Sequence, residues 1–418
     1  MIRRLLFIAF VLFNLNAYSQ QQFVINKSHL DYLTQDIVIN GKEMAIVHIY
    51  CNAPDYNYVD DSDEGYACVD DAARAGIFYL EYYKTFNDST SLLKYFKLVD
   101  FLLYMQSENG YFYNFIWPDN TINKDGITSK AEANWWSWRA FWCLIEGYDL
   151  FSKFDPERFS RVDQSVKKLV SAIKQNIPLE KNLVEINGFR FPEWLPFKYA
   201  ADQSALLIIT LTEYYEISKD EQIRDYINLL ADGIMQMQLN DDRCEFNGAF
   251  LSWENTWHGW GNSQSYSLLK AYQIFNNIKL KNSAIYELDN FYRKLIEIKY
   301  LNEFSVVKGD CDKYSIEEKK YSQIAYIIRP IVFSLIEAYK ITNNDKYAIM
   351  AGLAAKWLIG NNPSGQKVYN EKTGIVFDGI ESNTLLNKNS GAESTIEALL
   401  ILLKISQNKI ALNSFLNY

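Results

Sequence analysis

The chain has 418 residues, of which 49% are hydrophobic, 22% charged and 16% aromatic, with 8 prolines. This composition excludes a disordered, collagen-like or disulfide-scaffold protein, because it supplies ample apolar surface for a core. The 42 basic and 51 acidic side chains give a net charge of -9, and the basic ones form no block. Because a nucleic-acid binder needs a concentrated basic face, we expect no nucleic-acid partner.

The N-terminus has the pattern of a secretory signal peptide. Arg3 and Arg4 precede an apolar run at 5–15, and a small-x-small cleavage pattern follows at 17–19. The apolar run is shorter than the ~20 residues that span a bilayer, which argues against a membrane anchor. We therefore predict that residues 1–19 are removed, leaving a periplasmic or secreted protein with no membrane span.

Helical spacing of apolar residues dominates the rest of the chain. A β-like run covers 43–50, and from Tyr66 onward the spacing predicts eleven helices in neighbouring pairs, with short links such as Lys219 inside several pairs. Two of the longer connections, 101–118 and 234–253, resemble each other, because both close a helix with Met-Gln and then present Phe and Trp. The predicted helices lie at about 66–86, 91–106, 131–151, 157–177, 198–218, 220–238, 262–276, 283–300, 321–341, 343–360 and 391–405.

A helix pair that recurs with an aromatic loop is typical of a repeat toroid, in which each hairpin buries its face only against its neighbours. We therefore predict an all-α fold, an (α/α)6 toroid of helical hairpins with a short N-terminal β-like segment. Eleven helices plus that segment come close to the required count. An open α-solenoid is the alternative. The predicted organisation is a signal peptide at 1–19, an N-terminal segment packing on the barrel at 20–65, and one catalytic domain at 66–418.

The cysteines and the acidic loop give little support for a metal. The five cysteines are scattered and form no C-x-x-C pair, which argues against a zinc knuckle or a dithiol redox site. A disulfide between Cys51 and Cys68 and buried free thiols both stay open. The acids at 60–64 offer ligands for Ca²⁺ but lack the spacing of a twelve-residue calcium loop. No metal or cofactor is predicted.

Asp70 and Asp71 form the first candidate site. They fall in the opening turn of a predicted helix, with Arg74 one turn later on the same face. The helix dipole also stabilises acids at this position, so capping is the structural alternative. Two adjacent carboxyls beside an arginine, preceded by the acids at 60–64, favour a catalytic pair over capping alone.

Glu132 lies before a cluster of aromatic residues. Trp135, Trp136 and Arg139 follow it at the start of a predicted helix. Helical spacing sends some rings of this segment into the core, but not all of them. We expect at least one ring near Glu132 to face a cleft, where a flat apolar surface can stack on a sugar.

Glu254 is the predicted general acid. Together with His258 it lies among three tryptophans, Trp253, Trp257 and Trp260. An apolar surround raises the pKa of a carboxyl, which a general acid working near neutrality requires. A packed loop with a buried ion pair is the structural alternative.

Three further residues complete the candidate cleft. Trp194 precedes a predicted helix, and Asp378 lies in the last connection between helices. Glu393 follows Asn, Ser and Gly residues that form a helix start, so capping is an alternative for it. All three are predicted to contact substrate.

The chain resembles the six-hairpin glycosidase superfamily in four motifs: GYACVDDAARA, WSWRAFWCL, SWENTWHGWGNSQSYSLLKAY and GAESTIEALL. In particular, it is similar to the all-helical hydrolase-like domains found alone in secreted bacterial proteins or fused to bacterial glycosyltransferases. The Asp-Asp pair also resembles the adjacent catalytic aspartates of helical-barrel α-mannanases. The resemblance implies carboxylates on the loops at one barrel end, at Asp70, Asp71, Glu132, Glu254 and Glu393, with aromatic platforms for sugar.

These features predict a secreted glycoside hydrolase that cleaves an oligo- or polysaccharide. Glu254 would protonate the glycosidic oxygen, and Asp70 or Asp71 would act as base or nucleophile. One alternative is a polysaccharide lyase on the same fold, with His258 or a tyrosine as base, although the candidate loops carry more acids than the arginines that an anionic sugar requires. The other is a non-catalytic carbohydrate-binding protein.

Overall fold

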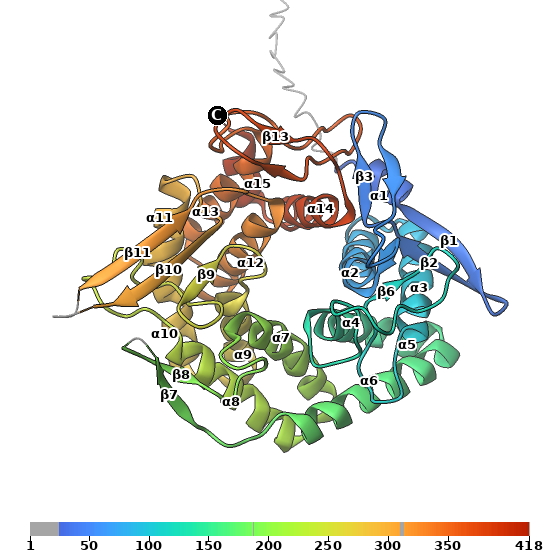
Figure 1. The fold of residues 1–418 in the computed structure, drawn as a ribbon, viewed down its shortest axis with the longest axis horizontal. Helices are drawn as coiled ribbons and strands as arrows, with labels where there is room; N and C mark the ends of the chain where they lie inside the picture. The colour runs from blue at the N-terminus through green and yellow to red at the C-terminus, as the bar shows by residue number, and fades with distance from the viewer. Residues whose placement is uncertain (1–24, 187, 310–312, 418) are drawn as a thin grey trace, which may run out of the picture.

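The protein is described by a computed structural model of residues 25–417, except 187 and 310–312, and structural statements concern these residues. Figure 1 shows a ring of helices around a central axis, with a second layer of helices outside it. This is the predicted (α/α)6 toroid, and the prediction of the fold is confirmed. The predicted signal peptide and Cys311 lie outside the described residues.

Six inner helices form the wall of the ring. Each packs against the next, and the last packs against the first, which closes the toroid (Figure 1). Because every inner helix is followed by an outer one that returns along it, all six inner helices begin at the same end. The inner helices are α2 (Val69–Phe86), α4 (Trp135–Glu146), α7 (Ala201–Ser218), α9 (Gln264–Phe275), α12 (Ala325–Thr342) and α14 (Ala392–Ser406).

The outer helices cover the apolar faces that the ring turns outward. A short helix, α5 (Tyr148–Phe154), lies between α4 and its outer partner. The outer helices are α3 (Ser89–Tyr104), α6 (Pro156–Asn176), α8 (Glu221–Gln236), α10 (Ile278–Glu287) continued by a π turn (Leu288–Tyr292) and α11 (Arg293–Glu297), α13 (Asp345–Ala355) continued by a 3-10 turn (Lys356–Ile359), and α15 (Lys409–Leu416).

Two-residue turns join inner and outer helices at one end of the toroid, and their sequences explain their shape. In four hairpins the inner helix ends at a residue in the left-handed region, and the next residue caps the outer helix by accepting a backbone N–H. Asn is well suited to both positions because its short amide tolerates positive φ and accepts hydrogen bonds. The pairs are Asn87 and Asp88, Lys219 and Asp220, Asn276 and Asn277, and Asn343 and Asn344.

Four sequence-based helix assignments need correction. The predicted helix 283–300 begins earlier, at Ile278, and a π turn at Leu288–Tyr292 interrupts it. The predicted helix 131–151 ends at Gly147, where α4 gives way to α5, and the predicted helix 343–360 leaves α-helical geometry after Ala355. The twelfth helix of the toroid is α15 at the C-terminus, which the periodicity did not predict. A helix of two turns contains too few apolar residues to establish a 3.6-residue period.

The two similar connections adopt the same local structure. In the first, Gln106 Nε2 donates to a carbonyl of its own loop and to the Ser165 carbonyl on the next outer helix, α6 (3.0 Å). In the second, Gln238 Nε2 donates to a carbonyl of its own loop and to the Ser283 carbonyl on α10 (2.9 Å). The Met-Gln motif therefore ties each loop to the outer helix that follows, as expected for a repeat.

Short strands occur in the N-terminal segment and in the loops. The predicted β-like run is β2 (Lys42–Val47), which pairs with β1 (Thr34–Ile39) in a hairpin against α3, while α1 (Ser28–Leu33) packs against α14. The other strands are β3 (Tyr50–Asn52) with β4 (Asn57–Val59), β5 (Ala67–Cys68) with β6 (Phe115–Ile116), β7 (Leu183–Ile186) with β8 (Phe189–Pro192), β10 (Glu303–Lys308) between β9 (Thr256–His258) and β11 (Tyr314–Lys319), and β12 (Gly379–Ile380) with β13 (Leu386–Asn387).

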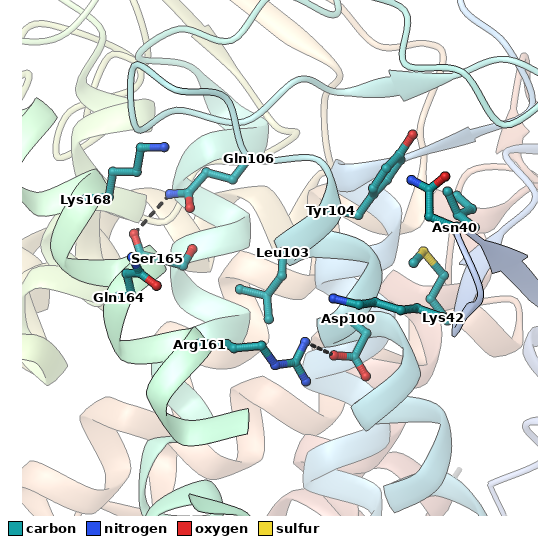
Figure 2. A pocket seen from close by; sticks show the side chains of 12 residues that line it. Asn40, Lys42, Asp100, Leu103, Tyr104, Gln106, Arg161, Gln164, Ser165 and Lys168 are labelled. Atoms are coloured by element: carbon teal, nitrogen blue, oxygen red, sulfur yellow. Dashed lines mark hydrogen bonds and ion pairs between the residues drawn. The ribbon is translucent and has the colours of Figure 1, made fainter. Parts of the chain in front are cut away.

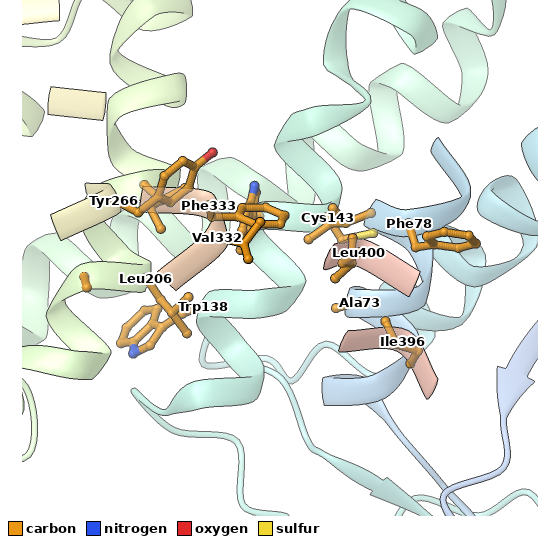
Figure 3. Packing of buried hydrophobic residues seen from close by; sticks show 14 of the residues in the cluster. Ala73, Phe78, Trp138, Cys143, Leu206, Tyr266, Val332, Phe333, Ile396 and Leu400 are labelled. Atoms are coloured by element: carbon orange, nitrogen blue, oxygen red, sulfur yellow. The ribbon is translucent and has the colours of Figure 1, made fainter. Parts of the chain in front are cut away.

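The core lies between neighbouring helices of the ring. Figure 3 shows buried side chains from several inner helices meeting there, among them Trp138, Leu206 and Val332. Burying a side chain of this size stabilises the fold by roughly 1.5–3 kcal/mol. The helical layers therefore carry the stability, and the loops at the end where the inner helices begin can carry polar chemistry.

The described cysteines are all free thiols. Cys51 and Cys68 are buried and unbridged, so the second of the two alternatives left open by the sequence applies. Among the helices that the structure describes, none combines the length and the apolar character needed to cross a bilayer.

Candidate active site

Most of the predicted site residues meet where the six inner helices begin. Side chains from different helices bind each other there: Trp138 on α4 donates to Gln203 on α7 (3.3 Å), and Arg329 on α12 donates to Glu397 on α14 (2.6 Å). Backbone N–H groups in the first turn of a helix lack intrahelical partners, so this end of the ring favours anionic groups. Two cavities open among these residues.

The first cavity, the acidic cavity, has a volume of about 350 Å³. Side chains from α2, α14 and the loops before them line it, and six acids face a single arginine. These are Glu64, Asp70, Asp71, Asp378, Glu381 and Glu393, with Arg74. Asp70 and Asp71 thus lie in one cavity with Asp378 and Glu393, predicted site residues from the far end of the chain.

Arg74 organises the carboxylates of this cavity. Its Nη2 lies 2.8 Å from Asp70 Oδ2 and 3.0 Å from Asp71 Oδ1, one turn earlier on the same helix. Its Nη1 lies 2.9 Å from Glu393 Oε2 and 3.2 Å from Glu397 Oε1, on the neighbouring helix α14. One buried guanidinium therefore fixes four carboxylates and joins the first inner helix to the last.

The environment shifts the pKa values of the adjacent aspartates in opposite directions. Burial raises the pKa of Asp70, but the charges of Arg139 and Arg74 outweigh burial, and the pKa is lowered. At Asp71 burial dominates over Arg74, and Asp70 and Glu393 add to it, so the pKa is raised to about 6. Two carboxyls whose pKa values are forced apart are suited to acid and base roles.

The carboxyl groups of Asp70 and Asp71 do not cap the N-terminus of helix α2. Helix α2 is capped by Cys68, whose Sγ accepts the Asp71 backbone N–H (3.3 Å), while the thiol donates to Asp71 Oδ2 (3.3 Å). Asp70 Oδ1 is buried and has no hydrogen-bond partner among the described residues. The aspartates lie in the first turn, where the helix dipole favours them, but Cys68 and not their carboxyls caps the helix, and Asp70 retains an acceptor for a ligand.

The second cavity, the aromatic cavity, has a volume of about 480 Å³ and is lined by the beginnings of α4 and α7 and the loop around β9. Trp253 is 46% exposed and Trp260 38% exposed, so their rings are accessible to a ligand. Trp135 supplies the predicted ring that faces a cleft. The remaining lining residues are Phe197, Ala200, Asp202, Gln203, Thr256, His258 and Glu303.

His258 and Asp202 form a buried pair in the aromatic cavity. His258 Nε2 lies 2.8 Å from Asp202 Oδ2, and Nδ1 lies 2.7 Å from the Trp260 carbonyl oxygen. The imidazole also stacks on the Trp260 indole, with the ring centroids 3.6 Å apart. These contacts hold the ring of Trp260 at the mouth of the cavity.

Arg139 and Tyr326 connect the two cavities. Arg139 binds Asp70 in the acidic cavity, and its guanidinium lies 5.2 Å from the Trp135 ring centroid in the aromatic cavity. It also donates to the hydroxyl of Tyr326, whose ring lies 5.1–5.2 Å from the guanidiniums of Arg74, Arg139 and Arg329. Tyr326 and Glu397 are not among the predicted site residues, because both lie within apolar helical runs that are typical of core.

Glu254 and Glu132 line neither cavity. Glu254 is half-buried in the turn before β9, in the left-handed region with φ 46°. Glu132 accepts a hydrogen bond from Asn134 (3.2 Å) ahead of α4. The carboxyl that the sequence analysis chose as general acid thus lies apart from the Asp70 and Asp71 pair.

Three predicted tryptophans are buried and also line neither cavity. Trp136 Nε1 donates to the Phe112 carbonyl (2.7 Å), and Trp194 Nε1 donates to the Leu229 carbonyl (3.0 Å). Trp257 belongs to β9, and its ring is buried in the core, stacked on Phe304. For Trp136 and Trp257 the direction of the side chain along the helix or strand explains the burial, because adjacent residues of an element point to different sides.

Within the described ranges, no group of three or more His, Cys, Asp or Glu side chains is arranged to hold a metal ion. The carboxylates of the acidic cavity are instead held by arginine.

No known protein-family profile matches the sequence, and neither does any curated protein sequence. Solved structures with the same fold include a sugar epimerase from a ruminal bacterium (14% identity, TM-score 0.58, covering 87% of this chain and 92% of that one). A cellobiose 2-epimerase from Bacillus thermoamylovorans is similar (13% identity, TM-score 0.59, covering 86% and 92%). A family 76 glycoside hydrolase from a bovine Bacteroides thetaiotaomicron strain also matches (12% identity, TM-score 0.53, covering 87% and 74%). At the level of fold, these matches confirm the resemblance to six-hairpin glycosidases.

Proposed function

We propose that the protein is a carbohydrate-processing enzyme that hydrolyses glycosidic bonds of a neutral oligo- or polysaccharide. The observation that carries this proposal is the pair Asp70 and Asp71, whose pKa values are shifted in opposite directions in a cavity that Arg139 joins to an aromatic one. Neighbours of the same fold include both sugar epimerases and glycoside hydrolases, which supports carbohydrate as the substrate class.

In this mechanism Asp71 is the general acid. Burial raises the pKa of Asp71 to about 6, so a fraction of its carboxyl groups stays protonated near neutrality and gives the proton to the glycosidic oxygen as the C–O bond breaks. Glu393, with a side chain 43% exposed and held by Arg74, accepts the proton of the attacking water. Asp70 stays ionised and holds Arg74 and Arg139 in place. This assignment replaces Glu254 because Glu254 lies outside both cavities.

The charge of the cavity favours a neutral sugar. Six carboxyl groups and one arginine line the acidic cavity, so a uronate would meet repulsion there. This argues against the lyase alternative, whose anionic substrate needs cationic partners. The exposed rings of Trp253 and Trp260 offer flat surfaces for the C–H face of a neutral pyranose.

A sugar epimerase is the second candidate function. The observation that favours it is the pair His258 and Asp202 in the aromatic cavity, because an imidazole can remove a proton beside a carbonyl. Both ring nitrogens of His258 already face protein oxygens, and so the imidazole must release a partner before it can act. Asp71 is held as well, by Arg74 and by the Cys68 thiol, so its carboxyl must also release a contact before it reaches a substrate.

Incubation of the protein with a panel of neutral glycans, uronate-containing glycans and free reducing disaccharides tests the proposal. New reducing ends that disappear in Asp71→Asn and persist in Glu254→Gln are the expected result. Epimerised disaccharide without cleavage, lost in His258→Asn, would assign the epimerase instead. Ultraviolet absorbance from unsaturated uronates would assign a lyase. Glycan binding without any turnover across the panel would favour the non-catalytic alternative. Export from the cell, expected from residues 1–19, stays a separate prediction.

A further inference from the structure

A third cavity, the basic groove, lies on the outer wall of the toroid, away from both cavities described above. It has a volume of about 420 Å³, within the range of small-molecule sites, and opens between the β1–β2 hairpin, α3 and α6 (Figure 2). Three basic side chains line it against one acid: Lys42, Arg161 and Lys168 against Asp100. The chain as a whole has a net charge of -9, so the sign of the charge in this groove is opposite to that of the whole chain.

The hairpin that carries Lys42 is held firmly in place. Its turn is Asn40-Gly41 with φ of 52° and 76°, the combination that favours a tight two-residue hairpin. On the outer side, Lys97 of α3 lies 2.6 Å from Asp36 of β1 and 3.3 Å from Glu43 of β2. The β1–β2 hairpin is therefore a fixed wall of the groove, and it presents Lys42 toward α6.

The positive charge of the groove exceeds what its acid can neutralise. Asp100 pairs with Arg161 (2.8 Å) and also with Arg158 (3.0 Å), which has a second carboxylate partner in Asp155. Lys168 pairs only with the fully exposed Glu108 (3.1 Å), a contact that solvent weakens. Lys42 has no ion-pair partner among the described residues.

Ser165 supplies the second, independent observation. It is 5% exposed and lines the groove, yet its Oγ has no hydrogen-bond partner in the described part of the chain. The corresponding serine of the other repeat, Ser283, donates its hydroxyl to Gln238 Oε1 (2.6 Å). The two serines bind their glutamines identically through the main chain, so only Ser165 keeps a free hydroxyl. Figure 2 shows it on the same side of α6 as Arg161 and Lys168.

We infer that the basic groove binds the oxyanion of a small molecule, a carboxylate, sulfate or phosphate group. Lys42 and Lys168 would approach the anion from opposite walls, and Arg161 and the Ser165 hydroxyl would donate hydrogen bonds to it. Such charge-assisted bonds are the strong class of polar contact. A buried hydroxyl that otherwise lacks a partner gains one when the anion is bound, which offsets the cost of leaving it unpaired. This site is separate from the proposed hydrolytic one and stands without it.

The test is calorimetric titration of the full chain with three probes: inorganic phosphate, inorganic sulfate and glucuronate. We expect saturable binding of at least one probe, weakened by about tenfold or more in Lys42→Glu and by a smaller factor in Ser165→Ala. The preferred probe distinguishes a phosphate, a sulfate or a sugar acid as the source of the anion.

Lys409→Glu is the matched control, since Lys409 is exposed at the start of α15 and the substitution changes the net charge equally. The inference is overturned if none of the probes binds wild type, or if Lys409→Glu weakens binding as much as Lys42→Glu. Thermal unfolding of each variant excludes misfolding, and Arg161→Gln provides a second variant within the groove.

Discussion

The acidic cavity and the basic groove present opposite charges on the two sides of the same helical wall. In the acidic cavity one buried arginine binds four carboxylates supplied by α2 and α14. In the basic groove one carboxylate, Asp100, serves two arginines while two lysines face the space beside it. The first arrangement is a buried ion-pair network in a cavity with an excess of negative charge, and the second has an excess of positive charge.

This contrast shows how differently charges are placed where the inner helices begin and on the outer wall of the toroid. Inside the ring, packing on all sides excludes water, so charges interact strongly and pKa values move by large amounts. On the outer wall, solvent screens each ion pair. The groove is distinguished there by having more lysine and arginine side chains than carboxylates. We therefore expect substitutions in the acidic cavity to change chemistry and stability, and substitutions in the groove to change only ligand binding.

The largest expected effect is on turnover. Asp71→Asn should lower the hydrolytic rate by about 10²–10⁴-fold, because it removes the proton donor while preserving size. Initial rates on the glycan identified by the panel measure this. Lys42→Glu, in the groove, should leave the rate unchanged, and an equal loss in both variants would contradict the distinction between the two regions.

The next effect concerns stability. Arg74→Ala leaves buried carboxylates without their counter-ion and should cost about 3–5 kcal/mol of unfolding free energy. Arg161→Ala removes a guanidinium that is 37% exposed, and a pair of this kind contributes about 0–1 kcal/mol. Urea unfolding of both variants compares them. If Arg161→Ala proved as costly as Arg74→Ala, the groove would be a structural network rather than a binding site.

A third prediction concerns pH. The folded pKa of Asp71 is raised to about 6 from an ordinary 3.8, so its ionisation opposes folding, and the penalty grows as pH rises through this window. At full ionisation the penalty amounts to about 3 kcal/mol. Asp71→Asn should therefore gain stability relative to wild type between about pH 4 and pH 7. A stability difference that does not change with pH would show that Asp71 has an ordinary pKa.

The smallest expected effect compares the two repeats. Without ligand, Ser165→Ala should change the unfolding free energy by less than about 0.5 kcal/mol, because no hydrogen bond is lost. Ser283→Ala breaks the bond to Gln238 and should cost about 0.5–1.5 kcal/mol. Thermal melts of the two variants decide this. Equal losses would mean that the Ser165 hydroxyl is already satisfied.

The sequence predicted several parts of the site because they depend on local geometry. Asp70, Asp71 and Arg74 share one helix face at spacings of three and four residues, and the structure places them in contact. Trp135, Trp253 and Trp260 face a cavity, as expected for part of each tryptophan cluster. The sequence did not predict which rings of a cluster would line the cavity. Trp136, next to Trp135, and Trp257, between Trp253 and Trp260, are both buried.

By itself the sequence determined the repeating helical hairpins, the polar turns that join them and the carboxyl pair at the start of α2, because each depends on residues a few positions apart. Only the tertiary structure decided which carboxyl has a raised pKa, which arginine joins the two cavities and which serine keeps a free hydroxyl. These properties arise when the ring closes and brings α2 against α14 and the β1–β2 hairpin against α3. Burial and charge then act between groups that are hundreds of residues apart in the chain. Patterns of residues a few positions apart do not predict such contacts.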